Sequence, residues 1–226
     1  MSTEQRPKTE QKNLAVGSVI SKSELFIEKN QKIILIAIVA ILVLVGGFFG
    51  YKKLILEPKE VTASSEMFAA EQYFKNDDMD KALKGDGKHL GFLAIIDKYG
   101  NTQSGNLANF YTGSAYLSKG EFQKAIEYLE DYDSKDVFLG NQAKAMIGDC
   151  YMELNKIDDA IKNYNKALDN PNDMTTPFIL FKLGLAYEVK KDNKKALGNY
   201  KRIKTEFPAS SEARDIEKYI VRIENL

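Results

Sequence analysis

The residue types that most often carry out chemistry are scarce in this chain. Its 226 residues include one histidine, His89, and one cysteine, Cys150. These residues cannot form an internal disulfide, a thiolate metal cluster or a histidine-rich metal site. Asp149, next to Cys150, has the wrong charge to activate the thiol. We therefore expect no enzyme activity, catalytic residue, cofactor or metal, and interpret Cys150 as a small packing residue.

Two short motifs look like ligand-binding loops but depart from the patterns those loops require. Residues 76–80 resemble the start of a calcium loop, yet Lys81 and Gly87 stand where an EF-hand needs glycine and glutamate. Residues 85–91 are glycine-rich but match no phosphate-loop spacing, and no strand precedes them. We interpret residues 76–80 as a turn between helices, and we predict no small-molecule substrate.

The charge balance narrows the class of partner. Basic and acidic residues number 32 each, so the formal net charge is zero. Bulk electrostatics therefore gives no reason to bind nucleic acid, and we predict no nucleic-acid partner. A basic run over residues 190–204 is either a solvated surface or an end that faces lipid headgroups or a charged partner.

Residues 33–50 form an uninterrupted apolar run. The run contains no charge, is flanked by Lys32 and Lys52, and would span roughly 27 Å as a helix. A core helix would show a polar face, and a signal peptide would have a shorter apolar region near a cleavage site. We predict an uncleaved transmembrane helix over residues 32–56, in contact with the lipid bilayer through residues 33–50. Gly46 and Gly50 have the spacing of helix-pairing glycines, although glycine is also common in unpaired membrane helices.

The segments on either side of this helix carry weaker signals. The numbers of lysines near the two ends of the membrane helix are equal, so they do not set its orientation. Residues 1–32 hold six basic and four acidic residues, and this small excess of positive charge slightly favours a cytoplasmic location for the N-terminal segment. Residues 1–13 are polar and predicted to be disordered. Ser21 and Glu24 form a capping box, which predicts the start of a short juxtamembrane helix. Glu57 and Pro58 are expected to end the membrane helix.

A pattern of small and aromatic residues repeats along the rest of the chain. Three glycines, 35 and 36 residues apart, are each followed by a tyrosine, an alanine and a large apolar residue at fixed offsets: Gly113, Tyr116, Ala125 and Leu129; Gly148, Tyr151, Ala160 and Tyr164; and Gly184, Tyr187, Ala196 and Tyr200. The pattern predicts antiparallel helix pairs, in which the small residues let the backbones approach and the large ones fill the space beside them. Gly120 and Asn155, in the turns between, suit a left-handed helix end.

This pattern resembles the tetratricopeptide repeat, although the family's early tryptophan is absent. The resemblance implies an all-α solenoid of antiparallel helix pairs. A degenerate copy with Ala70, Tyr73 and Ala82 precedes the three repeats, and a capping helix with Ala213, Ile216, Ile220 and Ile223 on one face follows them. The predicted organisation is a cytoplasmic tail with a juxtamembrane helix (1–31), the membrane helix (32–56), a degenerate first repeat with an insertion (57–105), three repeats (106–208) and a capping helix (209–226).

The same resemblance implies a partner-binding groove, because the first helix of each pair lines the concave face in such repeats. The corresponding positions are Leu107, Phe110, Ser114 and Leu117; Gln142, Ala145, Asp149 and Met152; and Phe178, Phe181, Leu185 and Glu188. An apolar groove with isolated acids suits a partner helix or an unfolded chain. Some of these apolar residues could instead belong to the core, and we expect about half to be exposed.

The whole arrangement resembles the membrane-anchored ancillary subunit of the SecYEG translocon. That resemblance implies a single-pass protein of the inner membrane, with a cytoplasmic N-terminus and a periplasmic repeat domain. It also implies that the protein partners are translocon subunits, a membrane-anchored chaperone or exported chains. The alternative hypothesis is a structural scaffold of another cell-envelope complex.

Overall fold

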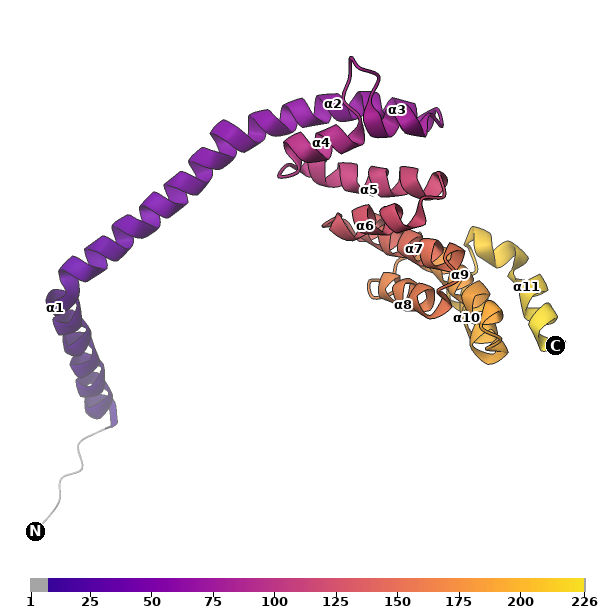
Figure 1. The fold of residues 1–226 in the computed structure, drawn as a ribbon. Helices are drawn as coiled ribbons and strands as arrows, with labels where there is room; N and C mark the ends of the chain where they lie inside the picture. Colours follow the sequence, from indigo (N-terminus) through magenta and orange to yellow (C-terminus); the bar gives the residue numbers. More distant parts are fainter. Residues whose placement is uncertain (1–7, 226) are drawn as a thin grey trace, which may run out of the picture. The chain divides into compact units, whose positions relative to one another are not determined.

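The computed structural model describes the backbone of residues 8–225 and the side chains of residues 26–225, all in helices and connecting turns (Figure 1). Within the described residues the pairing of strands is limited to one antiparallel bridge between Gly85 and Leu90. The chain divides into two compact units, Met1–Glu57 and Pro58–Leu226. The predicted all-α fold is confirmed.

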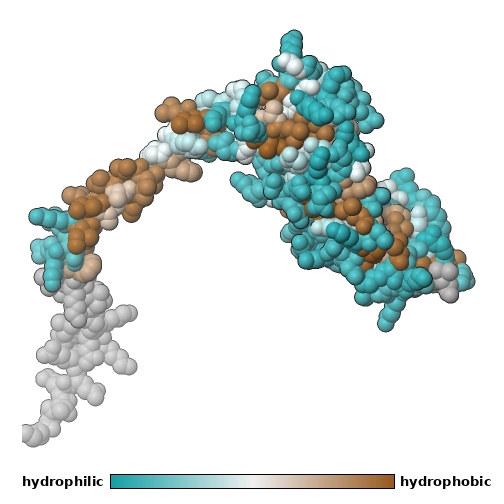
Figure 2. All heavy atoms as spheres, in the orientation of Figure 1, coloured by the Kyte–Doolittle hydropathy of each residue, from teal (hydrophilic) through white to brown (hydrophobic). Residues whose placement is uncertain are grey.

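The first unit is a long helix, α1 (Lys8–Tyr51), followed by a π-helical turn, η1 (Lys52–Leu56). Its most apolar stretch of 18 residues has a mean hydropathy of 3.0, and none of these residues is buried. The helix is therefore long and apolar enough to cross a membrane. Figure 2 shows apolar side chains over this part of the chain. Because no part of the unit covers these side chains, the helix is unlike the buried core helix of a soluble domain.

The helix begins earlier than predicted. It is already formed at Lys8, so the start expected at Ser21 is wrong, as is the disorder expected for residues 8–13. Helix-favouring Lys, Glu, Gln, Leu and Ala make up most of residues 8–15, which explains the longer helix. The side chains of Ser21 and Glu24, like residues 1–7, lie outside the described part.

The expected break at Glu57-Pro58 is also wrong, because the next helix, α2 (Glu57–Lys75), starts there without a gap. A proline lacks a backbone N–H, and its ring crowds the carbonyl one turn before it. The turn preceding Pro58 is π-helical, and the Glu57 N–H donates to the carbonyl of Lys52, five residues back. This wider turn places Pro58 in the first turn of a new α-helix, where proline is tolerated.

The second unit stacks helices in the order of the chain. The degenerate repeat comprises α2, α3 (Met79–Lys84) and α4 (Phe92–Tyr99); the three repeats comprise α5 (Gln103–Ser118) with α6 (Phe122–Asp131), α7 (Val137–Glu153) with α8 (Ile157–Ala167), and α9 (Thr176–Val189) with α10 (Asn193–Glu206); α11 (Ser211–Glu224) follows. In the three regular repeats each helix contacts its partner, and α4, α6, α8 and α10 each contact the next helix along the chain.

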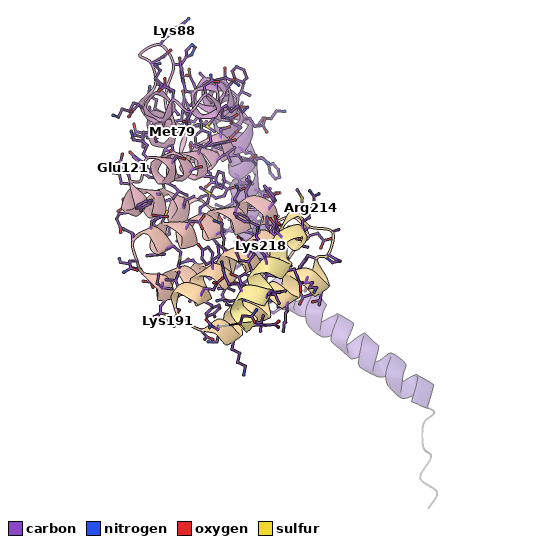
Figure 3. The ribbon with its side chains drawn as sticks, turned by 90° about the vertical axis from the view of Figure 1, so that its right-hand side faces the viewer. Met79, Lys88, Glu121, Lys191, Arg214 and Lys218 are labelled. Carbon is purple, nitrogen blue, oxygen red and sulfur yellow. The ribbon has the colours of Figure 1, made fainter. Side chains whose placement is uncertain are left out.

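The turn inside each of the four pairs has the same geometry. A residue with positive φ lies seven residues after the small residue in each case: Asp77, Gly120, Asn155 and Lys191. The next N–H donates to the carbonyl of the repeat tyrosine at 2.8–2.9 Å, which is a Schellman motif. The left-handed ends predicted at Gly120 and Asn155 are confirmed, and residues 76–80 form a repeat turn as predicted. Figure 3 shows Met79, Glu121 and Lys191, which mark three of these turns, along one edge of the solenoid.

The small residues lie at the helix–helix contacts, as predicted. A Cβ added at Gly184 would come within 2.3 Å of the Tyr200 ring, and one at Gly148 within 2.5 Å of Tyr164. A Cβ at Gly113 would meet Leu129 at 2.5 Å. The repeat alanines, Ala125, Ala160 and Ala196, have no exposed surface.

The capping helix is likewise confirmed. The Ser210 hydroxyl accepts the Ala213 N–H at 3.2 Å and so begins α11. Ile216, Ile220 and Ile223 are buried in one cluster with Tyr200 of α10.

Candidate protein-binding surface

The structure places the predicted groove residues on α5, α7 and α9. Among the twelve predicted groove residues, Phe178 is the one exposed residue, with 42% of its surface accessible. The half-buried ones are Leu107, Ser114, Leu117, Gln142, Asp149, Met152, Phe181, Leu185 and Glu188. The expectation that about half would be exposed is wrong, although their role in binding stays a prediction.

Phe110 belongs to the core. It is 7% exposed and packs against the rings of Tyr111 and Tyr132, with centroids 5.8 and 5.4 Å away. Tyr132, which directly follows the last residue of α6, therefore helps to bury Phe110. Ala145 is also buried, whereas Gln142 is half-buried. Phe110 and Ala145 therefore offer no surface to a partner.

Asp149 is not an isolated acid. Its carboxylate, on α7, accepts hydrogen bonds from Lys182 Nζ of α9 at 2.8 and 3.0 Å and from the Tyr164 hydroxyl of α8 at 2.7 Å. Burial, reinforced by the charge of Asp149, raises the pKa of Tyr164 well above its ordinary value, so its hydroxyl stays a donor. The ion pair neutralises the acid that the sequence left unpaired.

Glu188 repeats this arrangement one pair further on. Both of its carboxylate oxygens accept from Arg222 of α11 at 2.6 Å, and the Tyr200 hydroxyl also donates to it. Burial is the main reason that the pKa of Tyr200 is raised. Lys182 and Arg222, which the sequence reasoning missed, therefore make this surface nearly neutral.

One part of the surface keeps apolar groups accessible, and we call Phe178, Lys182, Leu185 and Asp149 the α9 patch. Phe178 and Leu185 are seven residues apart and so lie on one side of α9. The Lys182 ammonium lies 4.6 Å from the centre of the Phe178 ring, within range of a cation–π contact. The patch thus combines an exposed aromatic ring with a lysine already fixed by Asp149.

Two cavities in the repeat domain lie elsewhere. One of about 450 Å³ lies at the turns containing residues 76–80 and 118–119, and one of about 370 Å³ lies between the α6–α7 link and α8. Neither cavity is lined by a predicted groove residue. The α9 patch is an open surface, which suits a macromolecule better than a small ligand.

Neither Cys150 nor His89 lies in surroundings that would make its side chain reactive. Cys150 is fully buried, and burial, reinforced by Asp149, raises the pKa of its thiol to about 12. The thiol therefore stays protonated at neutral pH and is a poor nucleophile. His89 lies in an exposed loop, where its backbone N–H donates to Asp86 at 2.6 Å. In the described residues, no group of three or more His, Cys, Asp or Glu side chains could hold a metal ion.

The basic run near the end of the chain is largely neutralised within the domain. Five of its cations form ion pairs: Lys190, Lys195, Lys201, Arg202 and Lys204. This favours the interpretation of the run as a solvated surface. In the first unit, a Cβ added at Gly46 or Gly50 would meet nothing within 4 Å, so both positions are open to a neighbouring helix.

Comparisons with known proteins agree with this geometry. One family model of the tetratricopeptide repeat matches residues 113–133 and 142–173, and a second matches residues 179–210. A crystal structure of MamA superposes with a TM-score of 0.55 at 19% identity, covering 73% of this chain and 84% of that one. A putative kinesin light chain from Podosopora anserina with TPR-like repeats superposes with a TM-score of 0.54 at 13% identity, covering 72% and 85%.

At these identities the two structures show the fold alone. A search of curated proteins finds no match. The family matches over these three stretches, the glycine–tyrosine contacts and the repeated turns together lead to one conclusion: the second unit of this chain is a solenoid like those built from tetratricopeptide repeats.

Proposed function

We propose that this protein is anchored in the inner membrane by residues 33–50 and presents its solenoid to protein partners of the Sec translocon and its periplasmic chaperones. Tetratricopeptide repeats indicate a protein–protein interaction module. The observation that carries the proposal is the combination, in one chain, of this module with an uncovered apolar helix. The translocon assignment is supported by the resemblance of the whole arrangement to the ancillary subunit of SecYEG.

Membrane anchoring is supported by the chemistry of the first unit. Its large apolar side chains between Ile33 and Phe49 are exposed, apart from the half-buried Ile34. Contact of this apolar surface with water is unfavourable by about 25 cal/mol per Å². Lys32, Lys52 and Lys53 at the two ends are suited to the interfaces of a bilayer.

The orientation can be tested with an engineered cysteine. Ser211→Cys places a thiol on the exposed start of α11, whereas Cys150 is buried and gives a low background in the unaltered chain. We expect a membrane-impermeant maleimide to label the S211C protein on cells whose outer membrane has been made permeable while the inner membrane is intact. Labelling that requires lysis of the inner membrane would put the repeats in the cytoplasm and reject the proposal.

The partner can be identified by crosslinking from two matched positions. A photoreactive residue in place of Val189 lies on α9 near the α9 patch, and one in place of Lys162 lies on α8; both positions are exposed. Translocon subunits or chaperones crosslinked from position 189, and less from position 162, would support the proposal. Recovery of other envelope proteins instead would favour the structural scaffold.

A further inference from the structure

Each first helix of the three regular pairs has one side that receives the second helix of the preceding pair. We call this side the receiving face. It consists of four positions in each helix: nine, five and one residue before the repeat glycine, and two residues after it. These positions are Ser104, Ala108, Thr112 and Ala115 in α5; Leu139, Ala143, Ile147 and Cys150 in α7; and Thr175, Ile179, Leu183 and Ala186 in α9. Ile179, Leu183 and Ala186 share a core cluster with Ala160, Ile161 and Tyr164 of α8. All twelve residues except the half-buried Leu139 are buried.

The receiving face of α2 is more accessible than the same face of the three regular pairs. Counting from Ala70, its four positions are Val61, Ser65, Ala69 and Gln72. Val61 is 72% exposed, Ser65 is exposed, and Ala69 and Gln72 are half-buried, whereas the opposite side of α2 is buried on α4 and α5. Beside this face, Phe68 is 66% exposed. A position that accepts a helix in every other pair is thus accessible here.

The exposed sides of the first and last helices of the solenoid differ in charge. The outer side of α11 is charged, with exposed Arg214, Asp215, Glu217 and Lys218, and Figure 3 shows Arg214 and Lys218 on its surface. Such a polar outer side is what keeps a terminal helix soluble. The receiving face of α2 has no charged residue at any of its four positions, so it lacks the feature that protects the other end.

We propose that the receiving face of α2 pairs with the same face of a second copy of this chain, which forms a two-fold dimer. An uncharged face can meet its own copy without placing like charges opposite one another, and a two-fold pair is the commonest closed assembly. Ser65 and Ala69 let two backbones approach closely, and Val61 and Phe68 supply apolar contact. The charged side of α11 is a poor match for this face, which argues against a head-to-tail chain.

One helix packed on one helix buries less surface than the roughly 1,200–2,000 Å² typical of stable complexes. The dimer therefore depends on concentration, and two chains held in the same membrane meet this condition more readily than two free chains. This inference is independent of which protein occupies the α9 patch.

Disulfide crosslinking of the full chain in bilayer nanodiscs or native membranes tests the proposal. Ser65 lies in the middle of the receiving face, so S65C thiols meet near the two-fold axis. Ser211→Cys is the matched control, because it is an exposed serine at the charged end. With a mild oxidant, we expect the S65C chain to give at least several-fold more disulfide-linked homodimer than the S211C chain. Adding Val61→Lys and Phe68→Lys to S65C should reduce this dimer several-fold, and both sites are exposed enough to leave the fold intact.

Two results would overturn the proposal. One is a S65C homodimer yield no greater than that of S211C, including the case in which S65C is captured by a different protein. The other is a S65C dimer that resists the two lysine substitutions but disappears when Gly46 and Gly50 are replaced by leucine, which would assign pairing to the apolar helix. Circular dichroism of each variant verifies that the helical content is retained.

Discussion

Replacing Gly184 by alanine is expected to lower the free energy of unfolding of the repeat domain by about 1–3 kcal/mol. The added methyl group would lie 2.3 Å from Cε1 of Tyr200, closer than carbon atoms can pack. The Tyr200 ring has no room to withdraw, because it is fully buried beside Phe181 and Tyr219 and its hydroxyl donates to Glu188. Urea or thermal denaturation of the full chain in detergent, followed by circular dichroism, measures the effect.

Gly198 provides the matched control within the same pair of helices. It lies inside α10, and a Cβ there would meet nothing within 4 Å. Gly198→Ala should therefore stabilise the domain by about 0.5–1 kcal/mol, because alanine loses less backbone entropy in a helix. The prediction requires opposite signs for the two substitutions. Equal shifts in one direction would show that the Gly184–Tyr200 contact does not determine the need for glycine.

These contacts could be predicted from the sequence because they depend on local periodicity. The repeat glycine and the large residue sixteen positions later, such as Gly148 and Tyr164, are brought together by two helices and one short turn. The turn itself is fixed by a left-handed residue such as Asn155. Since each part is short and regular, spacing alone identified the pairs, the degenerate copy and the capping helix.

The features that the sequence did not predict depend on contacts between repeats or on backbone adjustments. Phe110 and Phe181 occupy the same place in their repeats, but Tyr132 covers Phe110 and Tyr219 packs on Phe181. Tyr132 follows the end of α6 and Tyr219 lies in the capping helix, so neither occupies a position of the repeat pattern. Likewise, the π-helical turn before Pro58 lets a helix continue where proline alone predicts an end.

The two clusters of an acid, a tyrosine and a cation, around Asp149 and Glu188, could be predicted only in part. Tyr164 and Asp149 belong to one pair of helices, and their proximity follows from the repeat. Lys182 lies 33 residues after Asp149, on the next first helix, and its approach depends on how two repeats stack. Spacing within a repeat cannot specify that offset, so the sequence left Asp149 as an isolated acid.

The same substitution should destabilise the fold strongly at Phe110 and only weakly at Phe178. Phe110→Ser empties a buried site, and we expect it to lower the free energy of unfolding by about 3–5 kcal/mol, the range for loss of a core phenylalanine. Phe178→Ser removes a ring that is 42% exposed, and together with Leu185→Ser, at a half-buried position, it should lower the melting temperature much less than Phe110→Ser does. Thermal melts of both proteins measure this contrast.

The Phe178→Ser/Leu185→Ser chain should also lose partner recovery, because exposed aromatic anchors contribute most of the energy of many interfaces. Affinity purification from membranes, with the partner quantified by mass spectrometry, should show at least a tenfold reduction, which corresponds to about 1.4 kcal/mol. Val221→Ser is the control, since Val221 is 47% exposed on α11 and is not part of the α9 patch. Full recovery with an unchanged melt would exclude the α9 patch as the binding surface. A collapsed melt would instead show that Phe178 and Leu185 support the fold, as Phe110 does. Reduced recovery with a preserved melt, and normal recovery for the Val221 variant, would place the partner on α9.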